Sequence, residues 1–136
     1  MRRIPPLSAL PLALALTAGL AAPAVQAETP AALAAAYARE AGAPPSAERG
    51  QQFFTTRHGA EWACASCHGA VPVQAGRHAA TGRTIAALAP AANPARLTDP
   101  AKVEKWLGRN CKDVAGRACS AQEKADVLTW LNTLQP

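Results

Sequence analysis

Apolar residues recur along this chain at helical spacing, and no stretch shows the convincing alternation of a strand. A first helix is expected over residues 29–42, with Leu33 and Tyr37 on one face. The sequence "APPS" then breaks the chain, and Ser46 can cap a second helix that runs to about Arg57. The pattern of the N-terminal half therefore predicts helical structure.

Two further helices are expected near the C-terminus. Asp99 is an N-cap before a proline at the first helical position, and Ser120 with Glu123 forms a capping box. The residues that should face inward are Val103, Trp106 and Leu107 on the first of these helices, and Val127, Trp130, Leu131 and Leu134 on the second. Before them lies a segment rich in Gly, Ala and Pro, residues 69–98. The whole pattern predicts an all-α domain.

The first 27 residues have the three parts of an export signal. Two arginines follow Met1, an apolar run covers residues 7–25, and "AVQA" offers small residues for cleavage after Ala27. The competing interpretation is an uncleaved membrane anchor, because the run is almost long enough to span a bilayer. Its prolines and the cleavage site favour export. We therefore expect a periplasmic protein with one domain at residues 28–136.

The charge of the chain is modest and scattered. The formal net charge of +5 falls to +3 without the two arginines of the leader, and there is no basic block. Nucleic acid is therefore a poor match, whereas a mildly acidic protein partner would fit. Few aromatic residues are available to a core built largely of Ala, Leu and Val. A bulky apolar cofactor could fill such a thin core.

The sequence "CASCH", residues 64–68, is the attachment signature of c-type haem. Cys64 and Cys67, three positions apart on a tight turn, can reach the two vinyl groups of the porphyrin and form thioethers. His68 can then present its imidazole nitrogen to iron. Export agrees with this interpretation, because the attachment takes place outside the reducing cytoplasm.

Three other interpretations of the cysteines are weaker. A C-x-x-C redox motif fits the spacing, but the histidine that follows and the absence of βαβ patterning argue against it. A four-cysteine zinc site needs a second close pair, and Cys111 and Cys119 are too widely spaced for one. A structural Cys64–Cys67 disulfide would leave His68 without a role.

The layout resembles the small single-haem class I cytochrome c fold, which implies an all-α domain with covalent haem. In that fold a Gly-x-x-x-Phe on the N-terminal helix crosses an aromatic-bearing C-terminal helix, so Gly50 and Phe54 should meet Trp130. "GRHAATGRTI", residues 76–85, also looks like the segment that hydrogen-bonds the proximal histidine in that fold and packs against the ring. The surrounding segment, residues 69–98, is then expected to wrap the haem edge.

The sixth iron ligand departs from the usual pattern. Electron-carrying class I cytochromes usually hold iron between His and Met, but the one methionine of the sequence is Met1, in the leader. The remaining candidates are His58, His78, Asn110, Lys105, Lys112 and water. Locally, His58 suits a helix C-terminus, His78 suits a surface or haem-edge position, and Asn110 suits a helix end. The residues alone leave the ligand open.

The stretch around Cys111 and Cys119 bears on the choice among these candidates for the sixth ligand. "KVEKWLGRNCKDVAGRACSAQEKADVLTWL", residues 102–131, closely resembles the sphaeroides haem protein family of oxygen-binding cytochromes c, and residues 76–100 are also similar. In that family, also described as a domain of unknown function, the Asn before the first cysteine is an axial iron ligand and the two cysteines form a disulfide. The resemblance therefore implies Asn110 as sixth ligand and a Cys111–Cys119 disulfide. Close relatives with His at the ligand position are bis-histidine electron carriers.

The same resemblance implies an exported redox protein that accepts electrons and binds oxygen, nitric oxide or carbon monoxide at ferrous haem. The implied electron donor is a dihaem cytochrome c, fed by a membrane cytochrome b. An amide oxygen is a hard ligand that ferric iron accepts better than ferrous iron, so reduction should release Asn110. Two alternatives stay open. One is a haem enzyme that reduces oxygen, hydroxylamine or peroxide, or acts as a nitric oxide dioxygenase; the other is a simple electron carrier.

Overall fold

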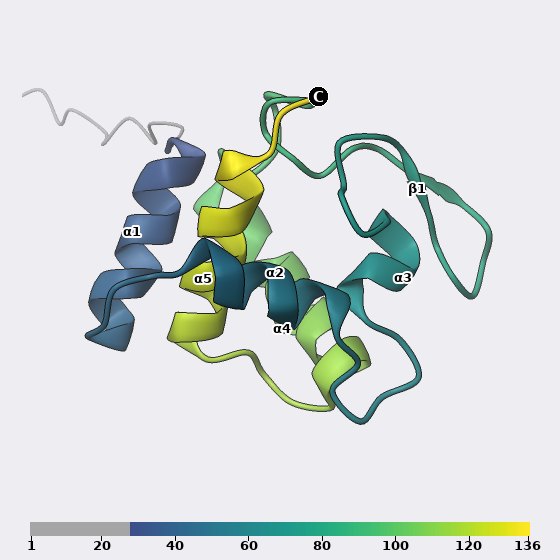
Figure 1. Ribbon diagram of the computed structural model, residues 1–136, viewed down its shortest axis with the longest axis horizontal. Helices are drawn as coiled ribbons and strands as arrows, with labels where there is room; N and C mark the ends of the chain where they lie inside the picture. The colour runs from purple at the N-terminus through teal and green to yellow at the C-terminus, as the bar shows by residue number, and fades with distance from the viewer. Residues whose placement is uncertain (1–27) are drawn as a thin grey trace, which may run out of the picture.

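The computed structural model describes residues 28–136, so the predicted leader and its cleavage after Ala27 lie outside the described residues. Five helices and one short strand pair make up this part of the chain (Figure 1). In chain order they are α1 (Pro30–Ala41), α2 (Ala47–Thr55), α3 (Cys64–His68), β1 (Gly76–Arg77), β2 (Thr84–Ile85), α4 (Pro100–Ala115) and α5 (Ala121–Thr133). None of the described helices is long and apolar enough to cross a membrane. The prediction of a helical domain is confirmed.

Each of the four longer helices begins at the cap that the sequence indicates. The side chains of Thr29, Ser46, Asp99 and Ser120 each accept a hydrogen bond from the backbone N–H three residues on, at 3.1, 3.2, 3.0 and 3.2 Å. Glu123 completes the predicted capping box by accepting from the Ser120 backbone N–H at 2.8 Å. These side chains satisfy N–H groups that have no partner within the helix.

The crossing of α2 and α5 is the packing contact expected from the sequence. Gly50 lies against the backbone of α5 at Asp126, where a Cβ atom would clash with the carbonyl oxygen. One turn later, the Phe54 and Trp130 rings lie 4.9 Å apart, centroid to centroid. The cluster at this crossing consists of Phe54, Val127, Trp130 and Leu131. The small residue lets the helices approach, and the large ones fill the space beside them.

A buried carboxylate fixes the start of α2 to α5. Asp126 is 4% exposed and accepts hydrogen bonds from the Ser46 backbone N–H at 2.7 Å, from Arg49 at 2.7 and 2.9 Å, and from Gln122 at 2.8 Å. Burial alone would raise the pKa of Asp126, but these bonds hold the pKa below its ordinary value. The carboxylate therefore stays ionised and fully partnered.

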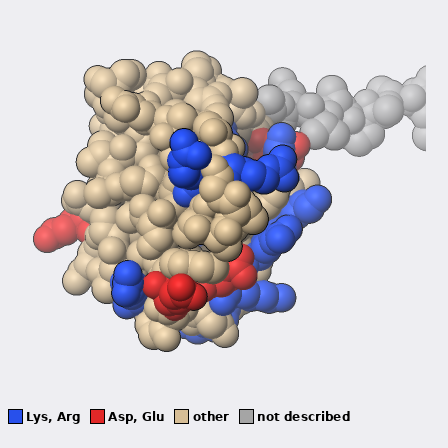
Figure 2. Space-filling model, turned by 90° about the vertical axis from the view of Figure 1, so that its right-hand side faces the viewer, with Lys and Arg blue, Asp and Glu red and all other residues tan. Residues whose placement is uncertain are grey.

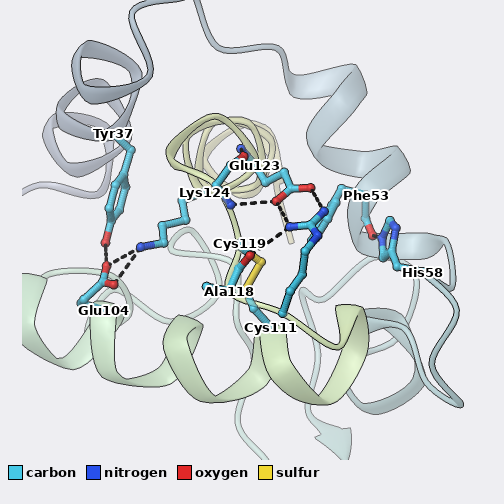
Figure 3. Close-up of a disulfide and its surroundings, with 11 residues drawn as sticks. Tyr37, Phe53, His58, Glu104, Cys111, Ala118, Cys119, Glu123 and Lys124 are labelled. Atoms are coloured by element: carbon cyan, nitrogen blue, oxygen red, sulfur yellow. Dashed lines mark hydrogen bonds and ion pairs between the residues drawn. A yellow bond between two sulfur atoms is a disulfide. The ribbon is translucent and has the colours of Figure 1, made fainter.

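A second cluster joins α1 to α4 and α5. Its buried residues are Leu33, Ala34, Tyr37, Val103, Ala125 and Leu128. Above it, the Tyr37 hydroxyl donates to Glu104 at 2.7 Å, and Lys124 donates to both Glu104 oxygens at 2.7 and 2.8 Å (Figure 3). Leu97, in the loop before α4, packs against this cluster and against the one around Phe54. Its φ of 60° lies in the left-handed region, which leucine rarely adopts.

Helix α4 is longer than the sequence suggests. It continues through Asn110 to Ala115 and ends at Gly116, whose φ of 69° is left-handed. The interpretation of Asn110 as a helix end is therefore wrong. A glycine can take the left-handed conformation at less steric cost than an asparagine, so the helix runs on to the glycine.

Trp106 also differs from its prediction, because its side chain is 46% exposed rather than turned inward. The buried residues of α4 are Val103, Cys111 and Val114. Trp106 precedes the half-buried Leu107 by one residue, which places it about 100° away round the helix. It therefore lies at the edge of the buried face.

The segment at residues 69–98 contains the one strand pair of the described chain. Gly76 pairs with Ile85 and Arg77 with Thr84, in antiparallel register. The expectation of no strand is wrong for these four residues. Strands of two residues are too short to show an alternating pattern.

Candidate haem site

The short helix α3 carries the two cysteines of the C-x-x-C sequence and the histidine that follows. Its first turn is fixed by Ser66, whose hydroxyl accepts a hydrogen bond from the Ala63 backbone N–H at 3.0 Å. Gly69, at φ 79°, ends the helix directly after His68. The two cysteines are not bonded to each other. One turn of helix thus presents two free thiols and an imidazole.

The core at the α2–α5 crossing supports α3. Cys64 and Ala65 pack against the cluster around Phe54, and the Phe54 and His68 rings lie 6.1 Å apart. Burial raises the pKa of the Cys64 thiol to about 11. Burial, followed by the nearby charge of Arg96, lowers the pKa of His68. The imidazole is therefore neutral near pH 7 and keeps a lone pair that could bind a metal ion.

The strand pair lies directly against α3, on the right of Figure 1. Gly76 sits against the Cys67 carbonyl oxygen and the His68 Cα, where a Cβ would clash. The Ala79 backbone N–H points to the Cys67 sulfur at 3.3 Å. Residues 76–85 therefore lie beside α3 at Cys67 and His68, and their packing against the ring stays a prediction. Within residues 28–136, however, this segment makes no hydrogen bond to the His68 ring.

The donor set fits covalent haem better than the alternatives. Cys111 and Cys119 form a disulfide with a Cα–Cα distance of 5.5 Å, so the four-cysteine zinc site is wrong. The described residues contain no group of three or more His, Cys, Asp or Glu side chains that could hold a metal ion. Cys64 and Cys67 remain as two free thiols beside an imidazole, which is what thioether attachment and one axial ligand require.

The two other histidines make hydrogen bonds to backbone groups within five residues of them in the sequence. His58 hydrogen-bonds through Nε2 to the Phe53 carbonyl oxygen at 2.8 Å and stacks on the Phe53 ring at 4.2 Å (Figure 3). It therefore satisfies a carbonyl in the last turn of α2, as its position in the sequence suggests. His78 lies in the exposed turn between β1 and β2, where its Nδ1 accepts from the Thr81 backbone N–H at 3.3 Å.

Asn110 stands inside α4, one turn after Trp106 and on the same face of the helix. It is half-buried, and its amide makes no hydrogen bond to another side chain or backbone group within residues 28–136. Lys105 and Lys112, the lysine candidates, are exposed on the same helix. Asn110 is therefore not a helix end, and no side-chain hydrogen bond within residues 28–136 gives it another structural role.

The residue after Asn110 is anchored covalently. Cys111 is buried, and its disulfide to Cys119 ties α4 to the start of α5 (Figure 3). Arg117, between the cysteines, donates to both oxygens of Glu123 at 2.6 and 2.8 Å. The hydrogen bond from Arg117 is the first of several causes that lower the pKa of Glu123 to about 2. Sequence reasoning missed this pair, because a spacing of six residues across a loop gives no helical signal.

Comparison with known proteins supports the same assignment. The family model described as "Domain of unknown function (DUF1924)" matches residues 40–131. The cytochrome c-type protein SHP of Cereibacter sphaeroides is 52% identical over 123 residues, which cover 87% of this chain and 95% of SHP. Cytochrome c'' of Methylophilus methylotrophus is 42% identical over 93 residues, 65% of each chain.

Solved structures of these relatives are similar in fold over most of this chain. A structure of oxidised SHP, described as an oxygen-binding cytochrome c, matches with a TM-score of 0.75 at 49% identity and covers 79% of this chain and 99% of its own. The crystal structure of oxidised cytochrome c'' matches with a TM-score of 0.70 at 36% identity, over 79% of this chain and 96% of its own. A solution structure of cytochrome c'' is described in terms of haem-ligand detachment.

Proposed function

Because the chain belongs to the family of SHP and cytochrome c'', we propose that it is an exported c-type cytochrome that accepts electrons and binds a diatomic gas in its ferrous state. The single C-x-x-C-H sequence implies one covalent haem c. When bound, that group would supply a redox-active iron that can also take up a small ligand. The proposed mature domain is residues 28–136, released into the periplasm by cleavage after Ala27.

In this proposal, Cys64 and Cys67 hold the porphyrin through thioether bonds. His68 would bind the iron, because its neutral imidazole stands next to the second cysteine on α3. The α2–α5 core fixes the direction of that helix through Cys64 and Ala65. These residues keep one side of the site constant in both oxidation states.

Asn110 would bind the iron in its ferric state. Its amide oxygen is a hard donor that matches ferric iron better than ferrous iron, so the reduced protein would hold Asn110 less tightly and would take up oxygen, nitric oxide or carbon monoxide. The disulfide at Cys111 limits how far the amide can move away, and Trp106 is the next side chain on the same face of α4.

One observation carries this proposal. Asn110 lies within a regular helix, makes no hydrogen bond within residues 28–136, and directly precedes a buried disulfide cysteine. An amide without a structural partner, held on a covalently anchored helix, is free to bind and release a metal. That SHP is described as oxygen-binding, and cytochrome c'' in terms of ligand detachment, supports the same function.

Optical spectra of the ferric, ferrous and ferrous-plus-CO forms test the proposal. The ferrous protein should bind CO rapidly, and the ferric protein should not bind it. Asn110→Ala should alter the ferric spectrum, whereas Asn132→Ala, the same change on α5, should not. An unchanged ferric spectrum in Asn110→Ala would reject Asn110 as ligand. A ferrous protein that keeps an internal sixth ligand and excludes CO would instead indicate a simple electron carrier.

A further inference from the structure

Four basic side chains form a stripe along the outer surface of α4. Lys102, Lys105, Arg109 and Lys112 are all exposed, and their spacing of three, four and three residues places them on one side of the helix. The buried residues of α4 lie on its other side. Since a helix rises 1.5 Å per residue, this basic stripe is roughly 15 Å long.

The basic stripe lacks ion-pair partners. The ion pairs within residues 28–136 are Arg49–Asp126, Arg117–Glu123 and Lys124–Glu104. Glu104, an acid on the same helix, is committed to Lys124 and Tyr37. Asp113 is near the end of the stripe but lies within ion-pair distance of none of its cations. The positive charge of the stripe is therefore largely uncompensated.

An open groove follows the basic stripe. Three cations of the stripe, Lys105, Arg109 and Lys112, contribute to its lining, together with the two acids Glu104 and Asp113. Nothing lies within 4 Å of the position where a Cβ of Gly108 would stand, so this part of α4 can be approached closely. Figure 2 shows that basic side chains gather toward the right-hand edge of one face of the molecule, with acidic ones mainly along its lower part.

We propose that the basic stripe of α4 docks an acidic redox protein that reduces this cytochrome. Carboxylates on the partner would meet the four cations, which raises the rate of encounter and orients the pair. The stripe borders the side of α4 that carries Trp106 and Asn110. The donor would therefore dock on the same helix as Asn110, the ligand that reduction is proposed to release. The donor loses one electron and the ferric iron gains it, with no transfer of atoms. This inference rests on the proposed function.

Stopped-flow reduction of the ferric, haem-loaded protein by reduced flavodoxin, an acidic flavoprotein, tests the docking surface. The variant Lys105→Glu/Lys112→Glu reverses two charges of the stripe and leaves Arg109 beside Asn110 untouched. The control Arg39→Glu/Arg57→Glu changes the net charge equally, at exposed cations outside α4. Lys112 and Arg39 each stand in the last turn of a helix, so both variants lose a similar helix-dipole interaction.

At low ionic strength, reduction of the stripe variant should be at least about tenfold slower than that of the wild type, and the control should lose less than about threefold. The wild-type rate should fall steeply with added salt, and the stripe variant should respond weakly. Equal losses in both variants would overturn the proposal. The proposal would also be overturned if the variants were reduced by flavodoxin at equal rates while binding to anionic phosphatidylglycerol vesicles depended on the stripe. That result would indicate that this surface binds a membrane.

Binding of CO to the ferrous stripe variant separates this inference from the proposed function. The stripe variant should bind CO as the wild type does. If CO binding is kept but the flavodoxin rates do not distinguish the variants, the docking surface is wrong and the proposed function stands. If neither the wild type nor the variant binds CO, the proposed function fails whatever the docking result.

Discussion

The two sides of α4 that flank its buried face differ in how they are held. On one side, Glu104 binds Tyr37 of α1 and Lys124 of α5, so three helices meet at one carboxylate (Figure 3). On the other side, Trp106 is 46% exposed and the Asn110 amide has no hydrogen-bond partner within residues 28–136. We call the first the supported side of α4, because its contacts hold the helix in place. We call the second the free side, because its two side chains lack such contacts; it carries Asn110, the proposed ligand.

The largest effect is expected when the Cys111–Cys119 disulfide, which lies between the two sides of α4, is removed. Cys111→Ala/Cys119→Ala should lower the free energy of unfolding by about 2–3 kcal/mol, because the unfolded chain regains the freedom of the closed loop. The same variant should bind CO faster in its ferrous form, since Asn110 can retreat further. Urea unfolding and CO flash photolysis measure the two effects. A change of stability with an unaltered CO rate would show that the disulfide has only a structural role.

The supported side alone is tested by Glu104→Ala. Lys124, whose side chain is 13% exposed, would lose both of its hydrogen bonds, and Tyr37 would lose its acceptor. Because Glu104 itself is 54% exposed, we expect a loss of about 1–2 kcal/mol in urea unfolding. The ferric spectrum should not change. Asp113→Ala, an exposed acid of α4 without an ion pair, is the matched control and should cost much less.

Acid should weaken a different carboxylate contact, the Arg117–Glu123 pair between α4 and α5. The folded-state pKa of Glu123 is about 2, below its ordinary value of 4.5. Its stabilising contribution is therefore complete above about pH 4.5 and is lost as the pH falls toward 2. Urea midpoints measured between pH 6 and pH 3 should fall less in Glu123→Gln than in the wild type. Parallel curves for the two proteins would contradict the role of the Arg117–Glu123 pair.

The smallest effect is expected on the free side. Trp106→Ala should raise the CO association rate roughly threefold, about 0.7 kcal/mol in the barrier, because a large side chain next to Asn110 is removed. Asn110 itself is unchanged, so the ferric spectrum should keep its form. Trp106→Phe, which retains most of the bulk, should give a smaller rise. A slower rate in Trp106→Ala would mean that the indole assists entry rather than obstructing it.

The sequence predicted those parts of the fold that depend on neighbouring residues. The caps at Ser46 and Asp99 are local hydrogen bonds three residues apart, and the structure contains them. The contact of Phe54 with Trp130 followed from a resemblance to a known fold and is also present. The Cys111–Cys119 disulfide, implied by the family, is confirmed.

Long-range polar contacts could not be predicted in this way. Tyr37 and Glu104 are 67 positions apart, and Ser46 and Asp126 are 80 apart, so no local spacing reveals them. The error at Asn110 has a different cause. Asparagine is common at helix ends, and only the continuation of α4 to Gly116 shows that this one is not at an end. The roles of Cys64, Cys67, His68 and Asn110 toward iron stay predictions.

Leu97 couples the local unfolding of the two buried clusters. One side chain packs against both buried clusters, and its backbone is held at φ 60°, a conformation that leucine does not keep without support. If α1 detaches from its cluster, Leu97 loses part of its packing. Leu97 also packs against the cluster around Phe54, which supports α3, so that cluster is loosened as well. The two halves of the interior share a single cooperative unit, and slow hydrogen exchange should extend across both of them together.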